Sequence, residues 1–196
     1  QLCTSLGHHV EEAQPPIDAM ALWQALGTLS NTLVARKVSA YEKTLGRKLK
    51  GHELESINLN SLKDGLKIDA VTHSNARHIA HQASRIMGAF MQQYDVILSP
   101  TMAMPPAKLG ALSMMQPYES FIGPAAAASA YTGIYNMTGQ PAMSVPLYWN
   151  AQNLPIGVMF AGRFGDEATL YQLAAQLEQA QPWLPRLQQL AMSLPS

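Results

Sequence analysis

Apolar residues recur at the three- and four-residue spacing of an amphipathic helix in four stretches of this chain. We predict helices over residues 18–34, over 53–67, where Gly65 weakens the helix, and over 69–93. The fourth helix is predicted from Asp166 to the proline at 182, with a short polar tail after it. The first and fourth helices both open on an aspartate, a residue type that caps helix N-termini well.

Short apolar runs bounded by turn residues predict three strands, over residues 94–99, 142–146 and 156–163. The chain opens on what resembles the last turn of a helix, ended by a glycine, and residues 8–13 read as a further short strand. Residues 100–130 carry five prolines and few charges, and a loop of that length is usually functional or disordered. Helices interspersed with strands predict an α/β fold, with a mixed β-sheet flanked by helices.

Charged residues make up only 13% of the chain, about half the usual share, and the net charge is zero. Nucleic acid is therefore excluded as the main partner, because phosphate binding needs a basic excess. No apolar run is long enough to cross a membrane, and residues 1–10 lack the pattern of a signal peptide. The single cysteine, Cys3, favours the cytoplasm. The low charge has two explanations: an uncharged polar surface, or a surface that is normally covered.

Four basic side chains, His73, Arg77, His81 and Arg85, are spaced by four residues along the longest predicted helix. At 3.6 residues per turn they form one polar stripe. No carboxylate or further ligand stands nearby, so we expect the stripe to face solvent or an interface and not a metal.

The residues that carry hydrolytic chemistry are present but not in working combinations. Ser144 lacks the Gly-x-Ser-x-Gly setting of a nucleophile elbow. Ser61 and Lys63 are two apart on a predicted helix and so face different directions, and Lys108 has no serine at a useful spacing. Cys3 lies in the first turn, which frays, and no glycine-rich phosphate loop is present. We therefore expect no complete catalytic site and no metal site in the chain.

Three segments, in this order and spacing, resemble the C-terminal part of the amidase signature family and its bacterial members. They are YDVILSPT at 94–101, YNMTGQPAMSVP at 135–146 and LPIGVMFAGR at 154–163. The start, LGHHVEEA at 6–13, is similar to the strand that follows the catalytic core in that family. The resemblance covers nearly the whole chain and is weakest from about residue 35 to residue 70.

The resemblance implies that residues 1–196 are the C-terminal portion of a hydrolase that cleaves amide C–N bonds. The family uses a Ser-Ser-Lys triad and backbone donors to an oxyanion, without a cofactor, and that machinery would lie upstream of residue 1. No residue here then inherits a catalytic role, and we expect this chain alone to be inactive. The alternative is a non-catalytic binding or interaction domain, or a subunit, derived from the same fold.

What the chain would supply under this resemblance is part of the substrate wall. Prolines after a strand end place a loop where pockets of α/β folds tend to lie, which points to Thr101, Met102 and Met104. Asn136 is a fourth candidate. No acidic residue stands between 123 and 136, which favours a small, mostly uncharged amide substrate. Without an upstream half, an uncovered sheet edge and apolar face would lead the chain to self-associate.

Overall fold

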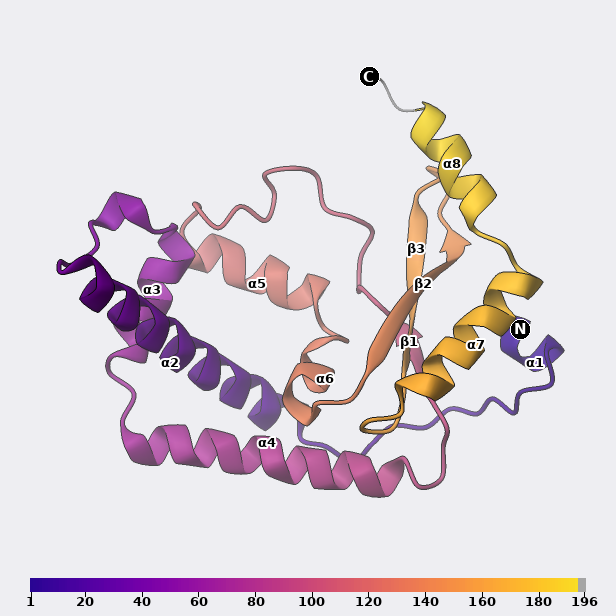
Figure 1. The fold of residues 1–196 in the computed structure, drawn as a ribbon, viewed down its shortest axis with the longest axis horizontal. Helices are drawn as coiled ribbons and strands as arrows, with labels where there is room; N and C mark the ends of the chain where they lie inside the picture. Colours follow the sequence, from indigo (N-terminus) through magenta and orange to yellow (C-terminus); the bar gives the residue numbers. More distant parts are fainter. Residues whose placement is uncertain (194–196) are drawn as a thin grey trace. The chain divides into compact units, whose positions relative to one another are not determined.

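The computed structural model describes residues 1–193, which fall into two compact units (Figure 1). The first, here called the sheet unit, comprises Gln1–Ile17, Ile86–Thr101 and the described part of Gly139–Ser196. The second, the helical unit, comprises Asp18–Arg85 and Met102–Thr138. No helix among the described residues is both long and apolar enough to cross a membrane.

The sheet unit contains a three-stranded sheet in the order β1-β3-β2. Its strands are β1 at Ile97–Pro100, β2 at Ala142–Trp149 and β3 at Pro155–Ala161. All three predicted strands are therefore confirmed. In the described residues β3 pairs antiparallel with both neighbours, so the parallel part of the expected mixed sheet is not found within them.

One face of this sheet carries the core of the unit. Val145 and Phe160 from the strands pack with the face of α7, Glu167–Ala180, formed by Leu170, Leu173 and Leu177. The leucines recur every three to four residues, so α7 presents them all to the sheet.

Helix α7 begins where the sequence predicts, because the Asp166 side chain caps it. The carboxylate accepts hydrogen bonds from the Thr169 N–H at 3.3 Å and the Thr169 hydroxyl at 2.8 Å.

The structure departs from the sequence analysis at both ends of the chain, and the strand predicted over residues 8–13 is wrong. Residues 8–13 follow the short helix α1, Leu2–Ser5, without forming a strand, because no neighbouring strand in the described residues takes their backbone hydrogen bonds. The short polar tail, for which we predicted no element, forms helix α8, Leu184–Ser193, in which Pro185 occupies the tolerated first turn. Arg186 anchors this helix, with its guanidinium 4.2 Å from the centre of the Trp149 ring.

The helical unit is built on α2, Ala19–Leu45, which continues well beyond the predicted end near Val34. Asp18 caps its start as predicted, accepting the Ala21 N–H at 3.0 Å. The residues after Val34 stay helical because they bury Ala35 and Val38, and the helix ends only where Gly46 takes a left-handed conformation with φ of 67°.

Helix α3, Ser56–Gly65, packs closely against α2 at Gly65. A Cβ atom on Gly65 would overlap the carbonyl of Asn31, lying 2.6 Å from its carbon and 2.9 Å from the Ala35 Cβ. The glycine that we predicted to weaken this helix is therefore what lets the two backbones meet. A backbone N–H in the first turn of α3 finds its acceptor in a segment far along the chain, since the Ile57 N–H donates to the Met114 carbonyl at 3.1 Å.

Helix α4, Ala70–Phe90, is the predicted long helix. It contributes to both units, because the helical unit includes it up to Arg85 and the sheet unit from Ile86 onward. The long segment after β1 contains a helix that we did not predict, α5 at Tyr118–Ala128, although Pro124 lies within it. The short helix α6, Gly133–Thr138, follows and packs on α2, where a Cβ atom on Gly133 would lie 3.2 Å from the Trp23 ring.

Candidate functional site

Thr101, the first candidate for the substrate wall, lies where β1 ends, next to both other strands. Its N–H donates to the Gly157 carbonyl at 3.1 Å, extending the pairing of β1 with β3 by one step. Its hydroxyl lies 2.6 Å from the Ser144 hydroxyl on β2. Thr101 is thus held by backbone on one side and by a side chain on the other.

Gly157 makes this arrangement possible. A Cβ atom there would overlap the Ser144 hydroxyl and lie 2.7 Å from the Thr101 hydroxyl oxygen. Any larger residue would therefore push the two hydroxyls apart. The hydroxyl pair and the glycine form one small polar patch, here called the hydroxyl patch.

The strand register places the hydroxyl patch on the face of the sheet opposite α7. Phe160, in the core under α7, lies opposite Leu98 and Met143, whereas Ser99 and Ser144 lie opposite the next residue, Met159. Since neighbouring residues of a strand point to opposite faces, Ser144 points away from the core. The Ser144 residue is exposed and Thr101 is partly exposed.

The hydroxyl patch offers binding chemistry without nucleophilic activation. In a pair of hydroxyls one proton joins the two oxygens, and the second proton and the remaining lone pairs are available to a ligand. Among the described residues, no serine hydroxyl is hydrogen-bonded to a lysine or a histidine. The patch can therefore orient a polar group such as an amide, but it lacks the base that an attacking serine needs.

The other three candidates belong to the helical unit and not to the unit that holds Thr101. Met102 and Met104 are 43% and 41% exposed, on a segment tied to the end of α5 by the Ala103 N–H, which donates to the Ala128 carbonyl at 3.2 Å. Asn136 is exposed on α6. The structure thus joins Thr101 to Ser144 and Gly157, which were not among the predicted binding residues.

The signal that would have found the hydroxyl patch was present in the sequence. Ser144 was considered only as a nucleophile, although a glycine on the middle strand leaves room for hydroxyls on the two outer strands to meet across it. Arg163 was also missed. It donates to the Met91 carbonyl at 3.0 Å and to the Asp95 carboxylate at 2.8 Å, which joins the end of β3 to the segment before β1.

The basic stripe on α4 lies as predicted. Arg77, His81 and Arg85 are exposed and His73 is partly buried. In the part of the chain that the structure describes, no group of three or more His, Cys, Asp or Glu side chains is placed to hold a metal ion.

Comparison with known proteins gives matches that include the three segments at 94–101, 135–146 and 154–163. A family model described as Amidase matches residues 1–171. The chain is 32% identical over 196 residues to a putative amidase AmiC of Mycobacterium leprae, and 27% identical over 197 residues to the 6-aminohexanoate-cyclic-dimer hydrolase of Paenarthrobacter ureafaciens. These matches take in 93% and 95% of this chain but only 39% of each relative.

Among solved structures, that of a 6-aminohexanoate cyclic dimer hydrolase superposes with a TM-score of 0.80 at 26% identity. The superposition covers 92% of this chain and 39% of that one, in its C-terminal part. The ordered segments quoted above, the α/β fold and the family match over most of the chain agree with one another. The chain therefore belongs to the amidase family.

Proposed function

We propose that residues 1–196 form the C-terminal portion of a single amidase domain that hydrolyses the C–N bond of a small, mostly uncharged amide. The family match carries this proposal, together with the share of each relative that the chain spans, which is 39%. In the proposed enzyme an upstream Ser-Ser-Lys triad supplies the nucleophile and the base, and upstream backbone donors stabilise the oxyanion. The cytoplasm is its proposed location.

In this proposal the chain supplies part of the substrate wall. The Thr101 hydroxyl, oriented by Ser144, contacts the polar amide group. Met102, Met104 and Asn136, which belong to the helical unit, are the other proposed substrate-binding residues. The flexible thioether side chains of the methionines can adapt to apolar bodies of different shape. Linear amides are the proposed substrates, and cyclic amides belong in the same assay because one relative is named for a cyclic dimer.

The experiment begins with the reading frame upstream of Gln1, which should encode a Gly- and Ser-rich segment and a lysine within about a domain's length. In the protein that includes this region, Thr101→Val should lower kcat/KM for its best amide by about three- to tenfold, the usual value of one neutral hydrogen bond. Ser144→Ala should have a smaller effect, because it removes only the partner that orients Thr101. Both variants are measured by ammonia release from primary aliphatic and aromatic amides, and by the release of a primary amine from cyclic amides.

Thr44→Val is the matched control. Thr44 is exposed on α2 and its hydroxyl bonds the Ala40 carbonyl of its own helix, so the same chemical change occurs away from the hydroxyl patch. An equal loss in T44V and T101V would contradict the assigned role of Thr101. A natural gene without the upstream region would contradict the amidase proposal and favour a binding domain or subunit.

We also propose that residues 1–196, produced alone, self-associate as a dimer or soluble aggregate. In the described residues the two outer strands, β1 and β2, each pair along one edge only, and an unpaired edge can accept another chain. Phe164 and Tyr171 are 79% and 76% exposed, and zero net charge gives little repulsion. Sedimentation velocity over a hundredfold concentration range should show a growing mean mass, and a monomer throughout would contradict the proposal.

A further inference from the structure

A pocket of about 490 Å³ lies at the C-terminal end of α2, wholly within the helical unit. Val38, Tyr41 and Leu45 line it from one face of α2, because residues three and four apart lie on the same side of a helix. Leu49 and Leu54, from the segment that follows the helix, complete the apolar wall. Small-molecule sites usually measure roughly 300–1,000 Å³, so this pocket has room for a small organic molecule.

The turn that closes the pocket is built by the end of α2. Gly46, in its left-handed conformation, lets its own N–H reach the Lys43 carbonyl and the Arg47 N–H reach the Glu42 carbonyl, both at 3.3 Å. These two bonds satisfy the last carbonyls of the helix and reverse the chain direction. The reversal brings Leu49 back toward α2.

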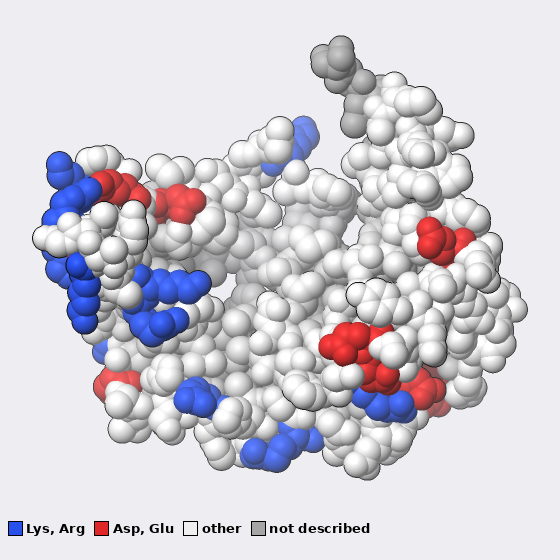
Figure 2. Space-filling model, in the orientation of Figure 1, with Lys and Arg blue, Asp and Glu red and all other residues white. Residues whose placement is uncertain are grey.

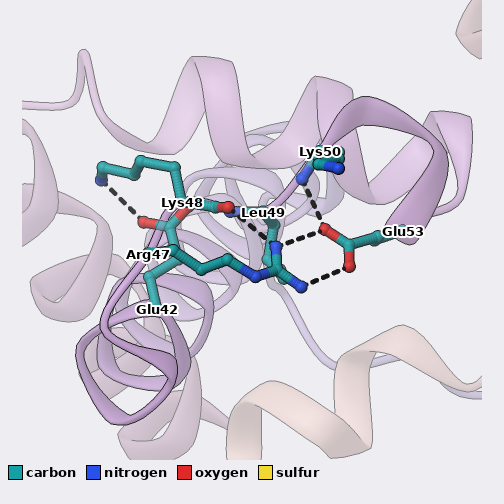
Figure 3. Close-up of polar contacts among 6 residues, drawn as sticks. All are labelled: Glu42, Arg47, Lys48, Leu49, Lys50 and Glu53. Carbon is teal, nitrogen blue, oxygen red and sulfur yellow. Dashed lines mark hydrogen bonds and ion pairs between the residues drawn. The ribbon is translucent and has the colours of Figure 1, made fainter.

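Two carboxylates then hold this turn in place (Figure 3). Glu53 accepts both arms of the Arg47 guanidinium, at 2.7 and 2.8 Å, and the Lys50 N–H at 2.7 Å. Glu42 accepts the Lys48 ammonium at 2.7 Å and the Leu49 N–H at 3.0 Å. Bidentate pairing fixes geometry as well as charge, so the pocket wall is organised before any ligand arrives.

Both carboxylates are ionised and engaged at neutral pH. The hydrogen bonds from the Arg47 guanidinium and then from the Lys50 N–H lower the pKa of Glu53 to about 2. The hydrogen bond from Lys48 likewise lowers the pKa of Glu42. The two carboxylates therefore neutralise Arg47 and Lys48, and neither forms an ion pair with the other Lys and Arg side chains nearby.

Those other cations are numerous. Residues 36–50 contain six of the thirteen Lys and Arg residues of the chain. Figure 2 shows Lys and Arg side chains gathered where Figure 1 places the end of α2 and the turn after it. Within the described residues no ion pair engages four of them, which are Arg36, Lys37, Lys43 and Lys50. One of the four, Lys37, lines the pocket one helical turn before Tyr41.

We propose that this pocket binds a small organic carboxylate. The apolar body lies against Tyr41, Leu45 and Leu49, and the carboxylate meets the Lys37 ammonium at the rim. A single unpaired cation in the lining matches a single negative charge, and the apolar wall requires a ligand with an apolar body. A bare phosphate or an acidic peptide would leave that wall without a partner, so neither fits as well.

Calorimetric titration of residues 1–196 with octanoate, below its micelle concentration, tests this proposal. Octanoate should bind measurably more tightly than 1-octanol or octylammonium. Lys37→Gln should weaken octanoate binding by about fivefold, as expected for one charge contact at an exposed rim, and should abolish its salt dependence. Tyr41→Ala should weaken octanoate and octanol alike, because it removes part of the wall.

Lys63→Gln is the matched control, since Lys63 is exposed on α3 in the same unit and does not line the pocket. It should leave octanoate binding unchanged, and circular dichroism should show all three variants folded. The proposal is overturned if octanol binds as tightly as octanoate, if K37Q and K63Q lose affinity equally, or if a hexaglutamate peptide binds more tightly than octanoate.

Discussion

Residues 1–196 alone are expected to release no ammonia from any simple amide above the rate in buffer. Amide hydrolysis by a serine needs a base within hydrogen-bond reach, and the described residues offer no such pair. The Ser144 hydroxyl bonds Thr101, and the lysines in side-chain hydrogen bonds, Lys48 and Lys67, bond carboxylates. Relative to the proposed full-length enzyme, activity should fall by at least about a millionfold, the lower end of enzymatic rate enhancement.

The measurement is ammonia release from aliphatic and aromatic amides by the purified chain, beside the protein that includes the upstream region. Turnover that survives repeated purification and disappears when one serine of this chain is mutated would contradict the expectation. Ser144→Ala is the first variant to examine, because Ser144 is an exposed serine on the sheet face opposite the core. Activity that is lost during purification would come from a contaminant and would support the expectation.

Gly65→Ala should lower the free energy of unfolding by about 3 kcal/mol, the upper part of the usual range for overpacking. The added Cβ would overlap the Asn31 carbonyl of α2, and backbone at a helix contact cannot rotate away as a flexible side chain can. The two helices must separate, which also loosens the packing of the buried Ala35. The melting temperature should fall by roughly 6–12 °C for a chain of this size.

Gly27→Ala is the matched control, on α2 itself. A Cβ on Gly27 has nothing within 4 Å, so the same substitution only improves helix propensity and should stabilise the protein by about 0.5–1 kcal/mol. The two variants should therefore shift the thermal melt in opposite directions. A Gly65→Ala protein as stable as the parent chain would show that α2 and α3 do not pack as described.

Local signals in the sequence located two helix caps and the three strands. Asp18 and Asp166 cap the helices that they were predicted to cap, and all three strands form where turn residues bound apolar runs. A cap depends on a side chain and backbone three residues away, so it can be predicted without the rest of the fold. The family, and with it the α/β fold, was also recognisable from the ordered segments before the structure.

Tertiary contacts decided the rest. Helix α2 continues past its predicted end because Ala35 and Val38 are buried. Helix propensity alone makes Gly65 a weak position in α3, but in the fold this glycine lets α3 pack closely against α2. Residues 8–13 form no strand for the opposite reason, since a strand needs a neighbour that local sequence cannot supply.

In the hydroxyl patch and in the pocket at the end of α2, single residues could be noted from the sequence, but their partners are set by the fold. Thr101 was identified from the proline pattern after a strand, but its partners Ser144 and Gly157 lie 43 and 56 positions further along the chain and meet it only through strand pairing. The cations between residues 36 and 50 were visible in the sequence as a basic stretch. Only the folded turn shows which of them are neutralised by Glu42 and Glu53 and that Lys37 lines a pocket, because ion pairing depends on distance in space and not along the chain.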